Sequence, residues 1–161
     1  MDKRFTLSER NILLYDGIST WKVDDADDVR VERFITSYKK SPAGADDRSY
    51  LDICTPLTLG RLRYSLRNFL LLKYPRHKLA SGDITQFGAG QAIATPDSIK
   101  GDCIAWFWRQ MDQGLVENIA VFKEGLIVER NVNDENRVDI LMTPDLVNQL
   151  MVIAAQMKFI L

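Results

Sequence analysis

The spacing of hydrophobic residues along this chain predicts both helices and strands. Three stretches repeat apolar residues every three or four positions, which is the period of an amphipathic helix. Each begins at a threonine whose hydroxyl can accept a backbone N–H of the first turn, and Thr6 with Glu9 matches the capping-box pattern. Glycine or proline follows each stretch. The expected helices run from Thr6 to about Tyr15, from Thr55 to about Tyr74, and from Thr95 to about Gly114.

Other segments alternate apolar and polar residues, which is the period of a strand. Residues 18–23 and 29–38 flank an acidic turn and predict a hairpin. Residues 125–132 and 137–142 flank a polar turn and predict a second hairpin. In the C-terminal residues 151–161 every second residue, from Met151 to Leu161, is apolar, so a further strand is expected at that end of the chain.

Three connections complete the predicted fold. Residues 78–94 form a glycine-bearing connection, and residues 115–124 form a short turn or helix. Thr143-Pro144-Asp145 either interrupts the strand ladder or starts a single helical turn. The expected fold class is α+β, with a small, mostly antiparallel sheet packed with two main helices. The length fits a single domain over residues 1–161.

The two longer helices are expected to have different surfaces. Apolar residues cover most of the second helix, and Arg63 and Arg67 form a narrow basic stripe between them. Salt bridges within the chain and docking against an acidic protein surface both remain open for the basic residues of this helix, Arg61, Arg63, Arg67 and Lys73. In the third helix Trp106 lies on the core arc and Trp108 at its rim, so Trp108 is the better interface candidate.

Composition and charge narrow the function classes. Apolar residues make up 46% and charged residues 27% of the chain, as in an ordinary soluble globular protein. The net charge of −1 gives no reason to expect nucleic acid or an anionic membrane as a partner. The apolar runs are too short to cross a bilayer, and the start lacks the pattern of a signal peptide. Cys54 and Cys103 are expected to be free thiols in a reducing, cytoplasmic folding environment.

The residue types offer little for catalysis or metal binding. His77 is the only histidine and lies between two basic residues, so a solvated or backbone-bonded imidazole is expected. The glycines of residues 88–92 lack the third glycine of a dinucleotide loop and the lysine of a P-loop, which favours a turn. The acidic residues at 24–28 and 46–47 are expected to be solvated turns, and the first group lacks the glycine and glutamate of a calcium loop. No catalytic residue, metal or cofactor is expected.

The apolar strand at the C-terminal end is the most unusual feature. An unpaired strand exposes backbone N–H and C=O groups that can add to the sheet of another chain. Pairing within its own sheet and pairing with a neighbouring subunit fit the pattern about equally well, and both alternatives stay open. The residues concerned are Val152, Ile153, Ala154, Ala155, Gln156, Met157, Lys158, Phe159, Ile160 and Leu161.

Several stretches, taken in order, resemble one protein family. They are "YLDICTPLTLGRLRYSLRNFLLLKYPRHKLA", "FGAGQAIATPDSIK" and "GLIVERNVNDENRVDILMTPDLVNQL", and residues 9–38 are similar to the segment that precedes them in that family. Together they resemble the C-terminal part of the contractile tail sheath proteins of Mu-like phages. The strongest pieces, such as "KYPRHKLA" and "PDLVNQL", indicate ancestry and name no active residue.

The resemblance implies a structural function without catalysis. Sheath subunits stack as hexameric rings around a tail tube and contract to drive the tube into the host cell. This chain would be the C-terminal, tube-proximal part of a longer subunit. The implied partners are other sheath subunits, the tail tube protein, and the baseplate and tail terminator proteins. The implied location is the virion tail, after assembly in the host bacterial cytoplasm.

The resemblance also implies how neighbouring subunits pair. Terminal arms of related sheaths add strands to each other's small sheets, so residues 152–161 would pair with an edge supplied by residues 126–132 or 137–142. The hinge would lie near Thr143-Pro144-Asp145 or near Asn148-Gln149. Charge placement suggests a tube-facing contact formed by Arg61, Arg63, Arg67 and Lys73.

Two alternatives to the phage sheath remain open. The first is the sheath of a bacterial contractile secretion or bacteriocin machine, which shares the same chemistry. The second belongs to a different class, a small-molecule or nucleotide-binding enzyme domain that uses the glycines of residues 88–92.

Overall fold

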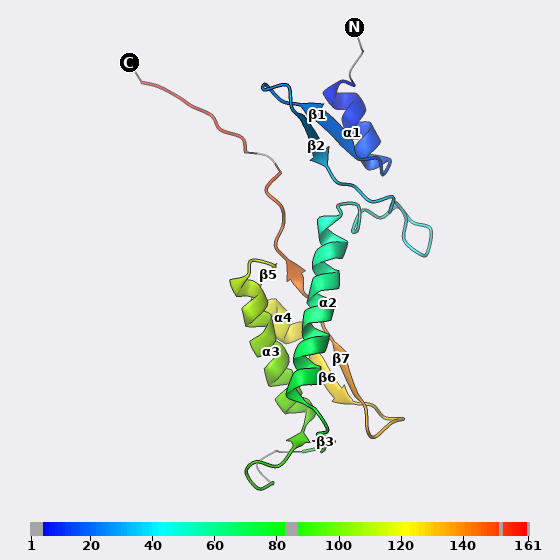
Figure 1. Cartoon of the computed structure of the whole chain (residues 1–161), viewed down its shortest axis with the longest axis vertical. Helices are drawn as coiled ribbons and strands as arrows, with labels where there is room; N and C mark the ends of the chain where they lie inside the picture. The colour runs from blue at the N-terminus through cyan, green and yellow to red at the C-terminus, as the bar shows by residue number, and fades with distance from the viewer. Residues whose placement is uncertain (1–4, 83–86, 152, 161) are drawn as a thin grey trace. The chain divides into compact units, whose positions relative to one another are not determined.

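The computed structural model of the protein describes residues 5–82, 87–151 and 153–160 (Figure 1). Two compact units make up the chain, residues 1–67 and residues 68–161, and their boundary falls inside one long helix. Each unit contains helices and short strands of its own. The expectation of a single domain is not decided by this division, because the helix at the boundary is continuous, and it stays a prediction.

The first unit opens with helix α1 (Leu7–Tyr15), which starts at the predicted capping box. The Thr6 N–H donates to Glu9 Oε2 at 2.7 Å, and the Glu9 N–H donates to Thr6 Oγ1 at 3.3 Å. The two side chains therefore satisfy amides that the helix itself leaves without partners. The helix is capped by Asp16, and Gly17 follows with a φ of 78°. An added Cβ at Gly17 would lie 3.1 Å from backbone atoms of Thr36 and Ser37, so glycine fits this turn best.

Strands β1 (Thr20–Val23) and β2 (Val29–Arg33) pair antiparallel and form the first predicted hairpin. The second strand is shorter than predicted. Beyond Arg33 the chain leaves the ladder and forms an isolated bridge between Ile35 and Asp52 instead. Pairing with this later segment competes with extension of the hairpin, which sequence periodicity alone does not reveal.

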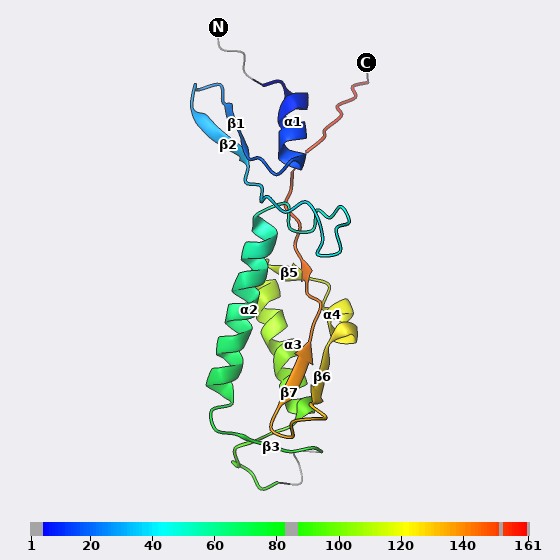
Figure 2. The same ribbon diagram turned by 90° about the vertical axis from the view of Figure 1, so that its right-hand side faces the viewer.

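Helix α1 lies beside the hairpin (Figure 2) and is tied to it by one carboxylate. Arg10 Nε donates to Glu32 Oε2 at 2.9 Å, and the buried Thr20 hydroxyl donates to the same oxygen at 2.9 Å. The hydrogen bond from Arg10 holds the pKa of Glu32 below its ordinary value. One small cluster of buried apolar residues in this unit consists of Leu14, Ile35 and Leu51.

Helix α2 (Cys54–Lys73) begins earlier than predicted. The expected cap at Thr55 is wrong, because the Asp52 carboxylate accepts the Cys54 N–H at 2.9 Å and the chain is already helical at Cys54. Pro56 consequently lies within the first turn, where its missing N–H leaves no intrahelical bond unmade. The predicted end of the helix, just before a proline, is confirmed.

Helix α3 (Pro96–Asp112) is the central element of the second unit. The predicted start is confirmed, since Thr95 Oγ1 accepts the Ser98 N–H at 3.2 Å and proline occupies the first helical position. In return, Ser98 Oγ accepts the Thr95 N–H at 2.9 Å, which completes a capping box. The predicted end is also confirmed, because Gly114 follows with a φ of 67° and donates its N–H to Met111 O at 2.8 Å.

One face of α3 carries the predicted core of this unit. Trp106 is buried and Trp108 is exposed, as their places on the helical wheel predict. The rings of Phe107 and Phe122 stack with centroids 3.8 Å apart. The largest fully buried side chains are Trp106, Phe107, Phe122, Leu126, Val116 and Cys103.

Short strands surround α3, and hairpin β6–β7 lies beside it in both ribbon views (Figures 1 and 2). One further helix, α4 (Ile119–Gly125), contacts α3 and confirms the short helix or turn predicted for residues 115–124. The strands of this unit are β3 (Lys78–Leu79), β4 (Ile93–Ala94), β5 (Val116–Glu117), β6 (Ile127–Arg130), β7 (Val138–Leu141) and β8 (Asp145–Leu146).

All strands among the described residues occur in two-stranded sheets. β6 and β7 form the second predicted hairpin, and β5 pairs antiparallel with β8. β3 and β4 pair in parallel across the glycine-bearing connection, a pair too short to produce a sequence period. Pro144 lies in the short irregular segment that separates β7 from β8. No helical turn starts there. The α+β class with mostly antiparallel pairing is confirmed.

One carboxylate links the end of α2 to α3 within the second unit. Asp102 accepts hydrogen bonds from Lys73 Nζ at 2.5 Å and from the Tyr74 hydroxyl. Burial, followed by the bond to Asp102, raises the pKa of Tyr74 to about 12. Burial likewise raises the pKa of the Cys103 thiol to about 11. Both groups are therefore protonated near neutral pH, and Cys103 acts as a packing residue.

We predict that Asp102→Asn lowers the free energy of unfolding by about 1–3 kcal/mol, because Lys73 loses its charged partner in a site that leaves Asp102 only 15% exposed. Urea unfolding followed by circular dichroism measures the change. Asp112→Asn, an exposed carboxylate on the same helix, is the matched control and stays within about 0.5 kcal/mol of the parent. Equal losses in both variants would contradict a special role for Asp102.

Candidate assembly surfaces

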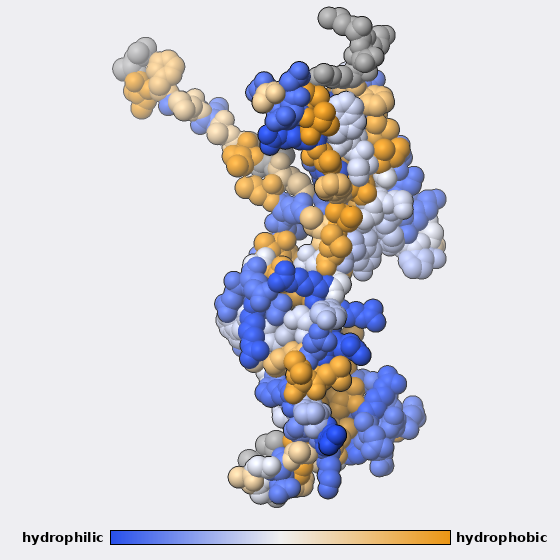
Figure 3. Space-filling model, viewed as in Figure 1, coloured by the Kyte–Doolittle hydropathy of each residue, from blue (hydrophilic) through white to orange (hydrophobic). Residues whose placement is uncertain are grey.

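The C-terminal tail (residues 147–161) is exposed at every residue that the structure describes there. After β8 the described residues of the tail form neither helix nor strand. Met157 is 96% exposed, Phe159 82% and Ile160 99%. Figure 3 shows that most residues along this segment are hydrophobic, with a few hydrophilic residues between them. Of the predicted pairing residues, Val152 and Leu161 lie outside the described part of the chain.

This exposure bears on the two alternatives that the sequence leaves open. Pairing of the tail within its own sheet is not found among the described residues. Transfer of one large apolar side chain from water into a protein environment is favourable by about 1.5–3 kcal/mol. A tail that carries several such side chains, together with unpaired backbone groups, therefore has much to gain from a partner.

Hairpin β6–β7 offers a complementary surface. Its ladder pairs Ile127 with Leu141 at one end and Arg130 with Val138 at the other. No further described strand pairs with the outer edge of either β6 or β7. Each outer edge therefore presents backbone N–H and C=O groups at the spacing that an added strand requires. The apolar side chains of Ile127 and Leu141 are also about half exposed.

Side chains hold the turn of this hairpin in place. Arg130 Nε donates to Glu135 O at 2.6 Å across the turn, and Arg137 Nε donates to Asp139 Oδ1 at 2.6 Å. Asn131 donates to Asp139 from the opposite strand at 2.5 Å. The bonds from Asn131 and Arg137 hold the pKa of Asp139 below its ordinary value, so the carboxylate stays charged. The turn of the hairpin is thus fixed by its own side chains, so the outer sheet edges are already formed without a partner.

The four basic residues predicted to face the tube are exposed but do not share one face of α2. Arg63 and Arg67 are four residues apart and lie on the same side, while Arg61 lies on nearly the opposite side of the helix. Lys73 is occupied by its ion pair with Asp102. The salt-bridge alternative is therefore found for Lys73, whereas no described carboxylate forms an ion pair with Arg63 or Arg67.

An exposed apolar row on α2 was not anticipated by the sequence pattern. Leu57, Tyr64 and Leu71 are each more than half exposed and recur every seven residues, which places them on one side of the helix. Sequence reasoning expects such residues to be buried, because a helix that is apolar nearly all round is usually covered on several sides. The row and the Arg63–Arg67 stripe are neighbours on the helix surface and could contact one partner together.

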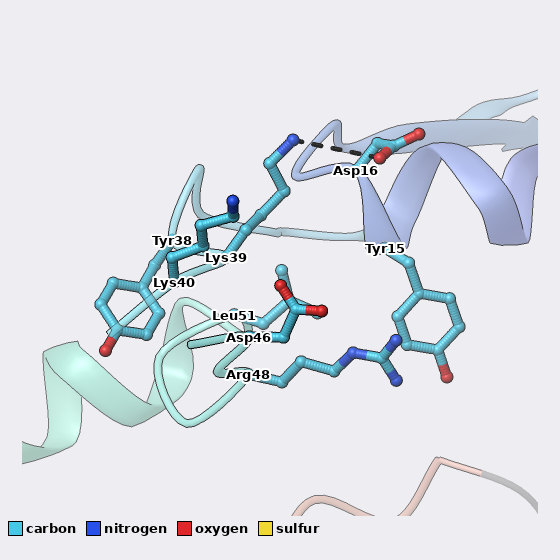
Figure 4. Close-up of a pocket in the computed structure, with 8 residues that line it drawn as sticks. All are labelled: Tyr15, Asp16, Tyr38, Lys39, Lys40, Asp46, Arg48 and Leu51. Carbon is cyan, nitrogen blue, oxygen red and sulfur yellow. Dashed lines mark ion pairs between the residues drawn. The ribbon is translucent and has the colours of Figure 1, made fainter. Parts of the chain in front are cut away.

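A pocket of about 310 Å³ in the first unit is a further candidate (Figure 4). Lys39 Nζ lies 3.9 Å from Asp16 Oδ1, and the Arg48 guanidinium stacks over the Tyr15 ring at 4.2 Å. Charges of both signs line the pocket, and neither histidine nor cysteine is among its lining residues. The lining residues are Tyr15, Asp16, Tyr38, Lys39, Lys40, Asp46, Arg48 and Leu51.

The histidine and the acidic turn that were considered as sites of chemistry both form hydrogen bonds with the backbone. His77 Nδ1 lies 3.2 Å from Pro75 O, which confirms the backbone-bonded imidazole. Asp24 Oδ1 accepts two backbone N–H groups of the β1–β2 turn, as expected of an acidic turn. The described residues contain no group of three or more potential ligands that could hold a metal ion. Among the helices that can be described, none is long and apolar enough to cross a membrane.

Two comparisons with known proteins identify the family of this chain. Residues 45–160 match a family model described as the phage tail sheath C-terminal domain, which is well over half of the chain. The chain belongs to the phage tail sheath family. All 161 residues also align at 44% identity with the Mu-like prophage FluMu tail sheath protein of Haemophilus influenzae. This sheath chain spans 33% of the length of that relative.

The family match covers only part of the sheath chain and leaves out its first 44 residues. The matched region, residues 45–160, contains α2, the hairpin β6–β7 and nearly all of the tail. Helix α1 and the hairpin β1–β2 precede the first matched residue, although they are included in the alignment with the longer relative. The tail, the hairpin β6–β7 and the surface of α2 therefore lie within the sheath C-terminal domain, whereas most of the pocket's lining residues precede it.

We predict that limited chymotrypsin digestion cuts the sheath chain first in the tail, at Phe159 and Leu150, and only later at Phe107 or Phe122. The first two side chains are exposed, and the last two are within the core. Mass spectrometry of early time points identifies the cuts. Simultaneous cleavage at tail and core sites would contradict the described difference in exposure.

Proposed function

We propose that, within a full-length sheath subunit, this region links neighbouring copies by strand addition. Residues 152–161 of one copy add to an outer edge of hairpin β6–β7 in the next. The proposed product is a polymer around the tail tube, located in the virion tail. The single observation that carries the proposal is that an exposed apolar tail and an unpaired, preformed sheet edge occur in the same family domain.

The dimensions of the two partners are compatible. β6 and β7 each contain four residues, and the pairing segment contains ten. About four tail residues can therefore pair with one edge while the others reach it or extend past it. In an added strand, Ile153, Ala155, Met157 and Phe159 would share one face, and that face would cover apolar surface of the receiving unit.

The hinge of this link is proposed to lie at Asn148-Gln149. The other candidate hinge, Thr143-Pro144-Asp145, is partly fixed by strand pairing, because Asp145 belongs to β8 and pairs with Glu117. Asn148 and Gln149 follow β8 directly and are outside any described strand. A change of backbone angles there would redirect the tail while both β5–β8 and the intersubunit ladder stay intact.

Contraction is part of the proposed function. Subunits assembled in the host cytoplasm would surround the tail tube, meet the baseplate and terminator proteins at the two ends, and shorten to drive the tube into the host cell. The similarity to a Mu-like prophage sheath protein supports a phage tail in preference to a bacterial secretion or bacteriocin machine. We propose no catalytic step for this chain.

The surface of α2 is proposed to contact the tube. Arg63 and Arg67 are exposed and have no described ion-pair partner, and the row of Leu57, Tyr64 and Leu71 lies next to them. Exposed ion pairs contribute only about 0–1 kcal/mol each, which suits a contact that must release when the sheath moves. Lys73 is assigned to the Asp102 cluster, and the tube contact rests mainly on the arginines.

A proline scan of the tail tests the proposed link. The protein for this test is a chimaera in which these 161 residues replace the matching third of the Haemophilus influenzae relative. In an edge strand only alternate N–H groups face the partner. We predict that proline at one phase of residues 153–158 weakens polymerisation at least about tenfold, whereas proline at the other phase has a much smaller effect. Sedimentation and electron microscopy of striated tubes measure polymer yield.

Deletion of residues 156–161 is the companion variant. It is expected to leave the thermal unfolding of the isolated chain unchanged while polymerisation of the chimaera is lost. Equal effects of proline in both phases would contradict pairing through the backbone. Loss of the folded state on deletion would show that the tail belongs to the core of its own unit.

A charge reversal tests the tube contact. Arg63→Glu together with Arg67→Glu is predicted to reduce binding of the chimaera to purified tail tubes by about tenfold at low salt, with a smaller difference at high salt. Polymerisation without tubes should be retained. Lys123→Glu, an exposed lysine on α4, serves as the control. Equal losses in the control and the double variant would remove the arginines from the proposed contact.

A further inference from the structure

The two faces of hairpin β1–β2 are covered unequally. Trp21 lies opposite Val31 in the ladder, and Val23 lies opposite Val29, so all four side chains project from one face. Thr20 and Glu32 project from the other face, where Arg10 ties them to α1. The face that α1 does not cover is therefore formed entirely by apolar side chains.

This apolar face is open to solvent. Trp21 is 55% exposed, Val29 70% and Val31 49%. A two-stranded hairpin is marginally stable in water unless its hydrophobic face is packed against another layer. Most sheets that expose one face to water carry polar residues there, and this hairpin instead carries tryptophan and valine. An apolar face of this kind is typical of a surface that packs against another layer.

We propose that the face formed by Trp21, Val23, Val29 and Val31 is a packing surface for sheath polypeptide that lies outside these 161 residues. The covering layer would present aliphatic or aromatic side chains to the valines and an acceptor to the Trp21 indole N–H. With α1 on the opposite side, it would complete a three-layer arrangement. This inference rests on family membership and does not require strand addition by the tail.

Two findings favour the remainder of the sheath subunit as the occupant. The longer relative has about three times the length of this chain, which provides the polypeptide needed. The hairpin also precedes residue 45, where the match to the C-terminal domain begins, so it is not assigned to that domain. A second copy of this chain is the competing occupant and is distinguished by the experiment below.

Thiol labelling measures whether the face is covered. Val29→Cys is compared in the isolated chain and in the chimaera, both with Cys54→Ser and both without residues 152–161 so that tail-mediated polymerisation plays no part. Site-specific labelling is followed by mass spectrometry. Val29→Cys is expected to react several-fold more slowly in the chimaera. Lys22→Cys, on the opposite face of the same hairpin, is the matched control and should react similarly in both proteins.

A stability measurement gives a second, independent result. Val31→Lys is expected to lower the melting temperature of the chimaera by several degrees and to leave that of the isolated chain nearly unchanged, since only the chimaera would bury the lysine. Equal labelling of Val29→Cys in both proteins would overturn the proposal. Protection that appears in the isolated chain as its concentration rises, together with dimers in sedimentation, would also overturn it and assign the face to a second copy.

Discussion

Backbone groups along the edge of a strand need partners, and a two-stranded sheet leaves one edge of each strand without them. This constraint shapes the whole chain, because every strand that the structure describes belongs to such a pair. The hairpin β6–β7 is held by its own turn and retains two open edges, while the tail retains apolar side chains and an unpaired backbone. A sheath subunit must be joined to its neighbours in any case. The proposed strand addition would satisfy the edge and form the joint with the same hydrogen bonds.

Local chemistry explains which parts of the fold the sequence predicts. The helix starts at Thr6 and Thr95 depend on side chains within three residues of the cap, and both are found as predicted. The start of α2 depends on Asp52, a residue outside the expected cap, and the prediction failed there. The pair β3–β4 and the bonds to Asp102 join residues that are distant in sequence, and two-residue strands and single side chains produce no periodic signal. These contacts become visible only when the chain is folded.

The candidate surfaces divide in the same way. The apolar alternation of the tail is a property of consecutive residues, so the sequence identifies the segment, but its partner depends on which edges the fold leaves open. The stripe of Arg63 and Arg67 is predictable from helical spacing, whereas the exposure of Tyr64 beside it is not. The apolar face of β1–β2 requires the register that sets Trp21 opposite Val31. In each case the sequence specifies the side chains on a surface, and the fold decides whether that surface is covered.

The proposed contacts differ in strength in the way that contraction requires. Each backbone hydrogen bond contributes about 0.5–1.5 kcal/mol, and the ladder also buries apolar side chains, so a short added strand gives a durable link. An exposed arginine contact is worth about 0–1 kcal/mol and is weakened by salt. When subunits move, the contacts to the tube would therefore break before the link between copies. Ordering the tail costs about 1–2 kcal/mol per residue, which limits the net strength of the link. The described residues of the tail form neither helix nor strand, so Asn148-Gln149 can change direction without breaking any described strand. A tail whose described residues form neither helix nor strand is thus consistent with a joint that holds while the subunits rearrange.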